Sequence, residues 1–273
     1  MAVGEGREYQ TNGLRLHVVW WNYADSGTAP LLLLHGLGES WRTFATLAPR
    51  FAWTRPVCGV DLRGHGASDK PVRSYGLQDY AADVLGIVEQ CSVHLLGHSL
   101  GALIALQVAA AHPACLGRLV LEDPVFPLTE PQQAQAVSML EQWLALKGQP
   151  FAVVVEALRP QYPSLARAWV EQLSRDLLAT VDGPFLALRN GEVLPWEQVH
   201  QGMTDLLSKV TVPTLVLVGD PMVGGMMGAE QRELLRTVLP SAHLIDFPGC
   251  GHHLEAASPE VFIAHVEAFL AGS

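Results

Sequence analysis

The sequence predicts an α/β protein with a mostly parallel central sheet, helices on both faces and an inserted helical cap. Short apolar runs, the length of strands buried on both faces, alternate with helical segments. One run leads through a glycine-rich turn, Gly97-His98-Ser99-Leu100-Gly101, into an alanine-rich helix. A long strand-free stretch interrupts the alternation. The apolar runs lie at 31–34, 93–96, 119–121 and 215–218, and the strand-free stretch lies at 125–209.

Local signals place the other elements. Asn12-Gly13 inside an alternating segment predicts a β-hairpin over 7–21. Helical periodicity predicts the helices, and Pro113 ends the helix that begins after the elbow. A glycine-rich loop follows the second parallel strand. Helices are predicted at 40–47, 77–90, 102–111 and 229–238, strands at 55–60 and 243–247, and the loop at 61–69.

The strand-free stretch predicts the domain organisation. Residues 1–124 and 210–273 form the core, and 125–209 form a helical cap over the carboxyl edge of the sheet. Helical periodicity and repeated prolines dominate this stretch. Its tryptophans are candidates for lining a substrate pocket or for packing the cap on the core; they are Trp143, Trp169 and Trp196.

Composition limits the function classes. The 273 residues carry a formal net charge of -10, which argues against nucleic acid and anionic membranes as partners. No signal peptide or membrane span is visible, so a cytoplasmic protein, monomer or homodimer, is expected. The four cysteines are scattered and are expected to be reduced and packed as small hydrophobes; Cys250 is the candidate for a reactive thiol.

The glycine-rich turn fits a G-x-S-x-G elbow between strand and helix. So tight a turn holds Ser99 in a strained conformation, and its glycines avoid collisions with the neighbouring backbone. The hydroxyl of Ser99 is lifted to the helix N-terminus. There the free N–H of Leu100 is a candidate oxyanion donor.

Four ordered motifs resemble those of the α/β-hydrolase superfamily, in its capped esterase, lactonase and dehalogenase branch. They span nearly the whole chain, although the cap is too variable to match. The motifs are His35-Gly36-Leu37-Gly38, Asp61-x-Arg63-Gly64-His65-Gly66-x-Ser68, Gly97-His98-Ser99-Leu100-Gly101 and Gly251-His252.

The resemblance implies a nucleophile, a base and an oxyanion hole. Ser99 is the nucleophile, and His252, late in the chain, is the base that activates it. The backbone N–H groups of Leu37 and Leu100 form the oxyanion hole. His98 is expected to shape the pocket, and His253 to pack beside the base. The 61–69 loop is expected to be structural.

The family uses two positions for the triad acid. One follows the elbow helix and its next strand, which gives Asp123 or its neighbour Glu122. The other follows the strand at 215–218, where Asp220 comes directly after Gly219 and the loop is short for this role. Asp123 is favoured, and Asp220 and Glu122 stay open. The acid would fix the tautomer of the histidine.

The expected function is therefore hydrolysis of a small carboxylic ester or lactone through an acyl-enzyme. Alternatives on the same fold are hydrolysis of a carbon–carbon bond and slow-hydrolysing ligand sensing. The dehalogenase resemblance ends at the nucleophile, because those enzymes attack with an aspartate. No cofactor is expected, and no metal, since His200, His243, His252 and His253 form no His-x-x-x-His pair.

Overall fold

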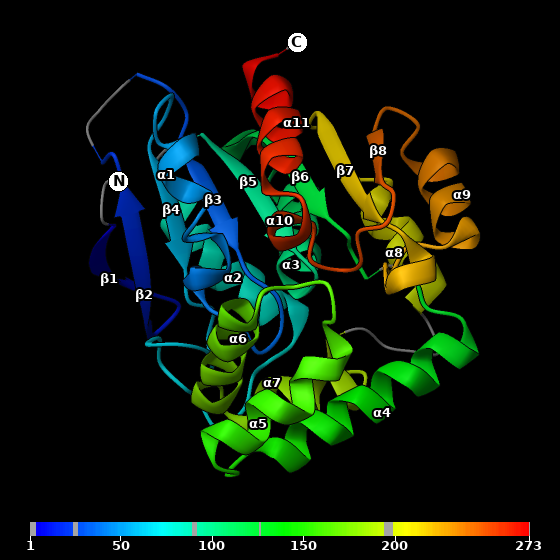
Figure 1. Ribbon diagram of the computed structural model, residues 1–273. Coiled ribbons are helices and arrows are strands. Elements are labelled where there is room, and N and C mark those ends of the chain that lie inside the picture. Colours follow the sequence, from blue (N-terminus) through cyan, green and yellow to red (C-terminus); the bar gives the residue numbers. More distant parts are fainter. Residues whose placement is uncertain (1–3, 24–26, 89–91, 126, 194–198, 273) are drawn as a thin grey trace.

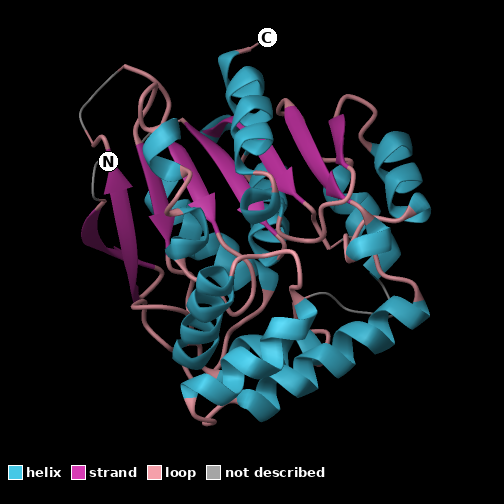
Figure 2. Cartoon of the chain, in the orientation of Figure 1, coloured by secondary structure: helices cyan, strands magenta, loops and turns pink. Residues whose placement is uncertain are grey.

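The computed structural model describes residues 4–23, 27–88, 92–125, 127–193 and 199–272, and contains an eight-stranded sheet (Figures 1 and 2). The order is β1-β2-β4-β3-β5-β6-β7-β8. β1 and β2 pair antiparallel, β2 pairs antiparallel with β4, and the remaining pairs are parallel. The strands are β1 (Glu5–Thr11), β2 (Leu14–Trp21), β3 (Leu31–Leu34), β4 (Val57–Val60), β5 (Val93–His98), β6 (Leu116–Glu122), β7 (Thr214–Gly219) and β8 (His243–Phe247).

The predicted hairpin is confirmed. Asn12 and Gly13 form its turn with φ of 49° and 74°, the positive values that match the twist of a two-residue hairpin. The helix predicted over 40–47 is wrong. A single 3-10 turn, η1 (Trp41–Phe44), forms after Ser40, and a short helix, α1 (Ala48–Phe51), begins only where Pro49 occupies its first turn.

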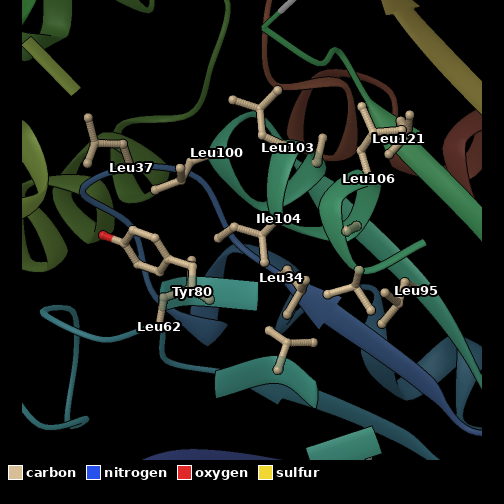
Figure 3. Packing of buried hydrophobic residues seen from close by; sticks show 14 of the residues in the cluster. Leu34, Leu37, Leu62, Tyr80, Leu95, Leu100, Leu103, Ile104, Leu106 and Leu121 are labelled. Carbon is tan, nitrogen blue, oxygen red and sulfur yellow. The ribbon is translucent and has the colours of Figure 1, made fainter. Parts of the chain in front are cut away.

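Helices cover both faces of the sheet. α2, α3, α8 and α9 lie over one face, and α1, α10 and α11 lie over the other (Figure 1). Alternate residues of β3 supply the two cores: Leu32 and Leu34 one, Leu31 and Leu33 the other. Figure 3 shows the first core around α3. The bounds are α2 (Leu77–Val88), α3 (Leu100–Ala111), α8 (Val199–Leu207), α9 (Ala229–Val238), α10 (Leu254–Ala257) and α11 (Pro259–Ala271).

Four further helices lie beyond the carboxyl ends of the parallel strands, toward which the arrowheads of Figure 2 point. They pack in two pairs, α4 with α7 and α5 with α6. α8, at the end of the strand-free stretch, contacts α3 and α9 instead. The four are α4 (Glu130–Leu146), α5 (Phe151–Leu158), α6 (Arg167–Ala179) and α7 (Asp182–Arg189). None of the helices in the described ranges combines the length and apolarity that crossing a bilayer requires.

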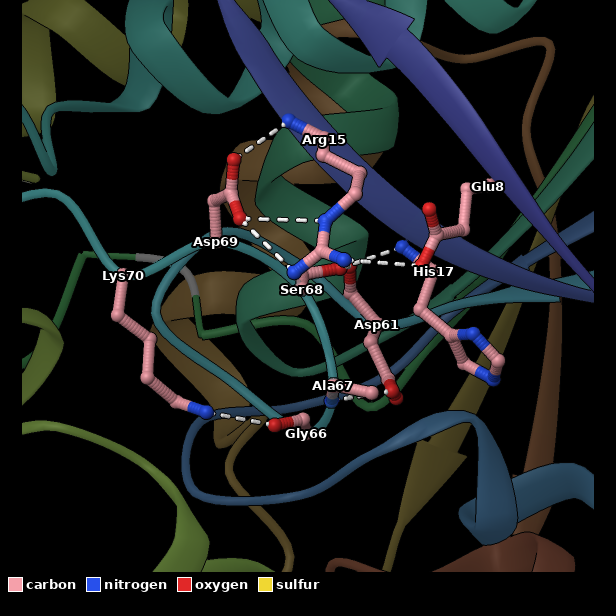
Figure 4. A network of polar contacts seen from close by, with 9 residues as sticks. All are labelled: Glu8, Arg15, His17, Asp61, Gly66, Ala67, Ser68, Asp69 and Lys70. Carbon is pink, nitrogen blue, oxygen red and sulfur yellow. Dashed lines mark hydrogen bonds and ion pairs between the residues drawn. The ribbon is translucent and has the colours of Figure 1, made fainter.

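The loop at 61–69 is held by hydrogen bonds within the loop and to η1 and β2. The carboxylate of Asp61 accepts hydrogen bonds from the N–H groups of Trp41 (2.9 Å) and Ala67 (2.9 Å). On β2, the N–H of Arg15 donates to Asp69 (2.8 Å), as Figure 4 shows. These bonds satisfy loop and strand backbone groups, in agreement with the structural role predicted for this loop.

The elbow glycines allow a testable prediction about stability. A Cβ atom on Gly101 would lie 2.1 Å from the carbonyl oxygen of Leu34, so Gly101→Ala must displace β3 or α3. We expect a loss of about 1–3 kcal/mol or more in the free energy of unfolding. Gly202 in α8 is the matched control, because a Cβ there meets no atom within 4 Å, and Gly202→Ala should be neutral or stabilising by up to about 1 kcal/mol. Urea unfolding measures both, and equal stability of the two variants would contradict the prediction.

Candidate active site

Ser99 occupies the turn between β5 and α3. Its φ of 52° and ψ of -113° are strained for a residue with a side chain. The turn has no room for larger residues: a Cβ on Gly97 would lie 2.2 Å from the carbonyl oxygen of Gly101. The predicted elbow is thus present, and it places Ser99 at the carboxyl edge of the sheet, ahead of the first turn of a helix.

His252 and Asp123 meet at this edge. His252 Nδ1 lies 2.7 Å from Asp123 Oδ2. The carboxylate also accepts hydrogen bonds from the N–H groups of Gly219 (3.0 Å to Oδ1) and Met226 (2.8 Å to Oδ2). Asp123 itself has a φ of 37°, a second strained conformation beside the elbow. A carboxylate held at Nδ1 requires a proton on that nitrogen and leaves Nε2 as the acceptor.

The pKa of His252 is lowered from its ordinary value, first by burial and then by the nearby charge of His98, although Asp123 acts in the opposite direction. A lowered pKa keeps the imidazole neutral, and hence able to accept a proton, at a lower pH than an ordinary histidine.

The two other candidate acids have different partners. The Asp220 carboxylate accepts hydrogen bonds from the N–H groups of Met222 (2.9 Å) and Gly249 (3.0 Å), and so holds the turn after β7 to the loop before His252. Glu122 is fully buried and accepts from the N–H of Glu255 (2.9 Å). Burial and the Glu255 carboxylate raise the pKa of Glu122 well above its usual range. Neither carboxylate has a described contact with His252.

The predicted oxyanion donors come from two separate segments of the chain. Leu37 follows β3 and Leu100 begins α3, and both line a pocket together with Ser99 and His252. Neither backbone N–H takes part in a hydrogen bond among the described residues. The first N–H groups of a helix have no partner within the helix, so that of Leu100 is free to bind a ligand oxygen.

The pocket between the elbow and helices α4 and α7 spans about 710 Å³, counting its opening to solvent. Its far wall is apolar, and the described lining contains no lysine or arginine. Trp143 lines it, which is one of the two roles considered for the tryptophans, whereas Trp169 packs against Tyr162 and His253. Trp196 lies outside the described residues. Besides Leu37, Ser99, Leu100 and His252, the lining residues are Glu39, Leu103, Val125, Leu128, Ala136, Met139, Leu140, Trp143, Tyr162, Leu188, Met226 and His253.

Glu39 is a site residue that the sequence reasoning missed. It follows the His35–Gly38 motif, lines the pocket and is 4% exposed. Its one signal was a charged residue within an apolar loop.

Glu39, His98 and His253 are the described side chains that could hold a metal ion, with ligand atoms within 4.8 Å of one another. Imidazole and carboxylate ligands suit zinc. However, His98 Nδ1 lies only 3.2 Å from Glu39 Oε1, so this pair is already charge-matched, and we propose no metal here.

The sequence singled out Cys250 as the candidate reactive thiol. Burial and the Asp220 carboxylate raise the pKa of the Cys250 thiol, which favours its unreactive, protonated form. Cys115 and Cys250 are free thiols, Cys58 is buried, and Cys91 lies outside the described residues.

A serine at a strand-to-helix elbow, with an acid and a late histidine at the same sheet edge, is the arrangement of α/β hydrolases. A family model described as "Alpha/beta hydrolase family" matches residues 31–265. This chain belongs to that family.

Several curated relatives are hydrolases of differing specificity. The chain is 28% identical over 260 residues to 2-(acetamidomethylene)succinate hydrolase of Mesorhizobium japonicum, covering 91% of each protein. It is 32% identical over 259 residues to pimeloyl-[acyl-carrier protein] methyl ester esterase of Neisseria meningitidis, covering 88% of this chain and 89% of that protein. The crystal structure of E-2-(acetamidomethylene)succinate hydrolase superimposes with a TM-score of 0.81 at 21% identity, covering 98% and 100% of the two chains. At that identity the superposition shows a shared fold.

Proposed function

We propose that this protein is a serine hydrolase that cleaves a carboxylic ester or lactone through an acyl-enzyme on Ser99. The observation that carries the proposal is the 2.7 Å contact between His252 Nδ1 and Asp123, beside an elbow serine that lines the same pocket. Asp123 fixes the tautomer in which Nε2 accepts a proton and stabilises the imidazolium once it forms.

In the first half-reaction, Ser99 Oγ attacks the carbonyl carbon and its proton passes to His252 Nε2. The negative charge that develops on the carbonyl oxygen is stabilised by the N–H groups of Leu37 and Leu100. The intermediate collapses, the bond to the alcohol breaks, and the leaving oxygen takes the proton from His252. In the second half-reaction water attacks the acyl-enzyme by the same route and releases the acid.

The pocket lining supports an uncharged, apolar acyl group as the substrate class. Burying a carboxylate without a partner is strongly unfavourable, and the described lining offers no lysine or arginine to pair with it. A succinate carries carboxylates, so we propose that this chain differs in specificity from the 2-(acetamidomethylene)succinate hydrolase that it resembles.

Initial rates on p-nitrophenyl esters test this proposal. We expect p-nitrophenyl butyrate and octanoate to be hydrolysed with kcat/KM about tenfold or more above that of p-nitrophenyl hydrogen succinate, which adds a carboxylate at similar length. Acetate and laurate esters then bracket the length of the pocket. Preference for the succinate ester would contradict the proposed substrate class. A folded protein that turns over no ester or lactone would favour carbon–carbon bond hydrolysis or ligand sensing.

A further inference from the structure

The Glu39 carboxylate joins segments that are distant in sequence. Oε2 accepts hydrogen bonds from the N–H of Gly36 (3.0 Å) and the hydroxyl of Thr43 (2.7 Å). Oε1 lies 3.2 Å from His98 Nδ1, and both side chains are buried. One carboxylate therefore connects the loop that carries the Leu37 N–H to the residue directly before Ser99.

His98 extends this connection to the loop that carries the base. Its Nε2 lies 3.2 Å from the carbonyl oxygen of His252. A carbonyl oxygen only accepts hydrogen bonds, so Nε2 carries a proton, and the Glu39 carboxylate favours a second proton on Nδ1. The ring of His98 also lies 4.6 Å, centroid to centroid, from that of His252.

We propose that Glu39 and His98 are positioning residues for the hydrolysis: their buried ion pair holds the Leu37 loop, the elbow and the His252 loop in one arrangement. The inference rests on the proposed function of Ser99 and His252. Neither residue forms or breaks a bond with the substrate. Their contribution is to fix where the oxyanion donor and the base lie relative to the nucleophile.

The charge of the pair acts on the base as well. The charged or titratable groups that face His98 are Glu39, Glu255, Asp123, His35, His252 and His253. Burial alone would lower the pKa of His98, but the carboxylates of Glu39, Glu255 and Asp123 together outweigh burial and raise the pKa to about 9. His252 faces His98, Asp123 and His253. A cationic His98 repels a proton on His252, so its loss should raise the pKa of the base and move the acid limb of the pH profile upward.

Neutral substitutions at the two positions test the pair. We expect His98→Gln and Glu39→Gln each to lower kcat/KM by about 10- to 100-fold, mainly through kcat. The acid limb of each pH profile should move to higher pH, because Glu39→Gln also leaves His98 without the counter-ion that keeps it charged. If the residues act as a unit, the double variant should lose no more than either single variant.

His94→Gln is the matched control, since His94 lies on the same strand, β5, and makes no described contact with His252. We expect it to keep the wild-type profile. Losses that multiply in the double variant, or an unmoved acid limb in a folded Glu39→Gln protein, would overturn the proposal.

Two measurements on the wild-type chain keep the test independent of the variants and of the substrate. Breaking a buried ion pair is strongly destabilising, so a single variant that fails to fold is replaced by ¹⁵N-histidine spectra of the wild type. We expect one imidazole to stay doubly protonated at pH 8; a spectrum without one contradicts the ion pair. The pH dependence of fluorophosphonate labelling of Ser99 reports the base without any ester. No labelling at any pH would instead contradict the proposed function.

Discussion

Replacing Ser99 with alanine is expected to reduce ester hydrolysis by about 10⁶-fold while leaving the fold intact. Without Oγ no acyl-enzyme forms, and His252 has no proton to accept. The pocket and the Leu37 and Leu100 N–H groups stay in place, so binding of the ester should change little. Steady-state kinetics and the urea midpoint measure the two effects.

A glycine at the same position sharpens this experiment. Glycine adopts the φ of 52° at Ser99 at little steric cost. We therefore expect Ser99→Gly to be inactive, with a free energy of unfolding about 1–3 kcal/mol higher than that of Ser99→Ala. An alanine variant that keeps wild-type turnover would refute the nucleophile assignment. A glycine variant no more stable than the alanine variant would refute the strain.

Replacing Asp123 with asparagine is expected to lower kcat by about 10⁴-fold. An amide donates as well as accepts, so it permits the tautomer in which Nδ1 of His252 lacks its proton. In that tautomer Nε2 carries a proton and no longer serves as the base. The amide oxygen can replace Oδ1 and still accept from the N–H of Gly219, but the NH₂ group that replaces Oδ2 cannot accept from the N–H of Met226, so some loss of stability is also expected.

The chain supplies matched controls in the two other candidate acids. Asp220→Asn should weaken the turn after β7 and lower stability by about 0.5–2 kcal/mol with little loss of kcat, because its partners are the N–H groups of Met222 and Gly249. Glu122→Gln should lose little activity, because Glu122 accepts from the N–H of Glu255. A loss of kcat in Asp220→Asn equal to that in Asp123→Asn would contradict the assignment of the acid.

Local sterics explain why the elbow was predictable from sequence. The two glycines of the G-x-S-x-G turn are needed by contacts within the turn and with the adjacent strand, so the five residues nearly determine the conformation of Ser99. The hairpin at Asn12-Gly13 follows the same logic, since positive φ values are required at both positions.

The choice among the candidate acids was harder to predict, because it depends on which carboxylate the tertiary structure brings close to His252. Asp123 and Asp220 each follow a strand at the same edge of the sheet, and the sequence gives no distance from either to His252. The Asp220 carboxylate instead accepts hydrogen bonds from the N–H groups of Met222 and Gly249. The spacing of residues in the sequence does not predict these bonds. The Glu39–His98 pair was missed for a similar reason, because it joins separate loops. The sequence over 125–209 indicated helices but not which side chains face the pocket.

Trapping of the covalent intermediate tests the central claim most directly. Wild-type protein is mixed with p-nitrophenyl butyrate during turnover, quenched in acid and mapped by peptide mass spectrometry. The account predicts a butyryl group on Ser99, absent from Ser99→Ala. Turnover with no acylated residue, or with the acyl group on another residue such as Cys250, would contradict it.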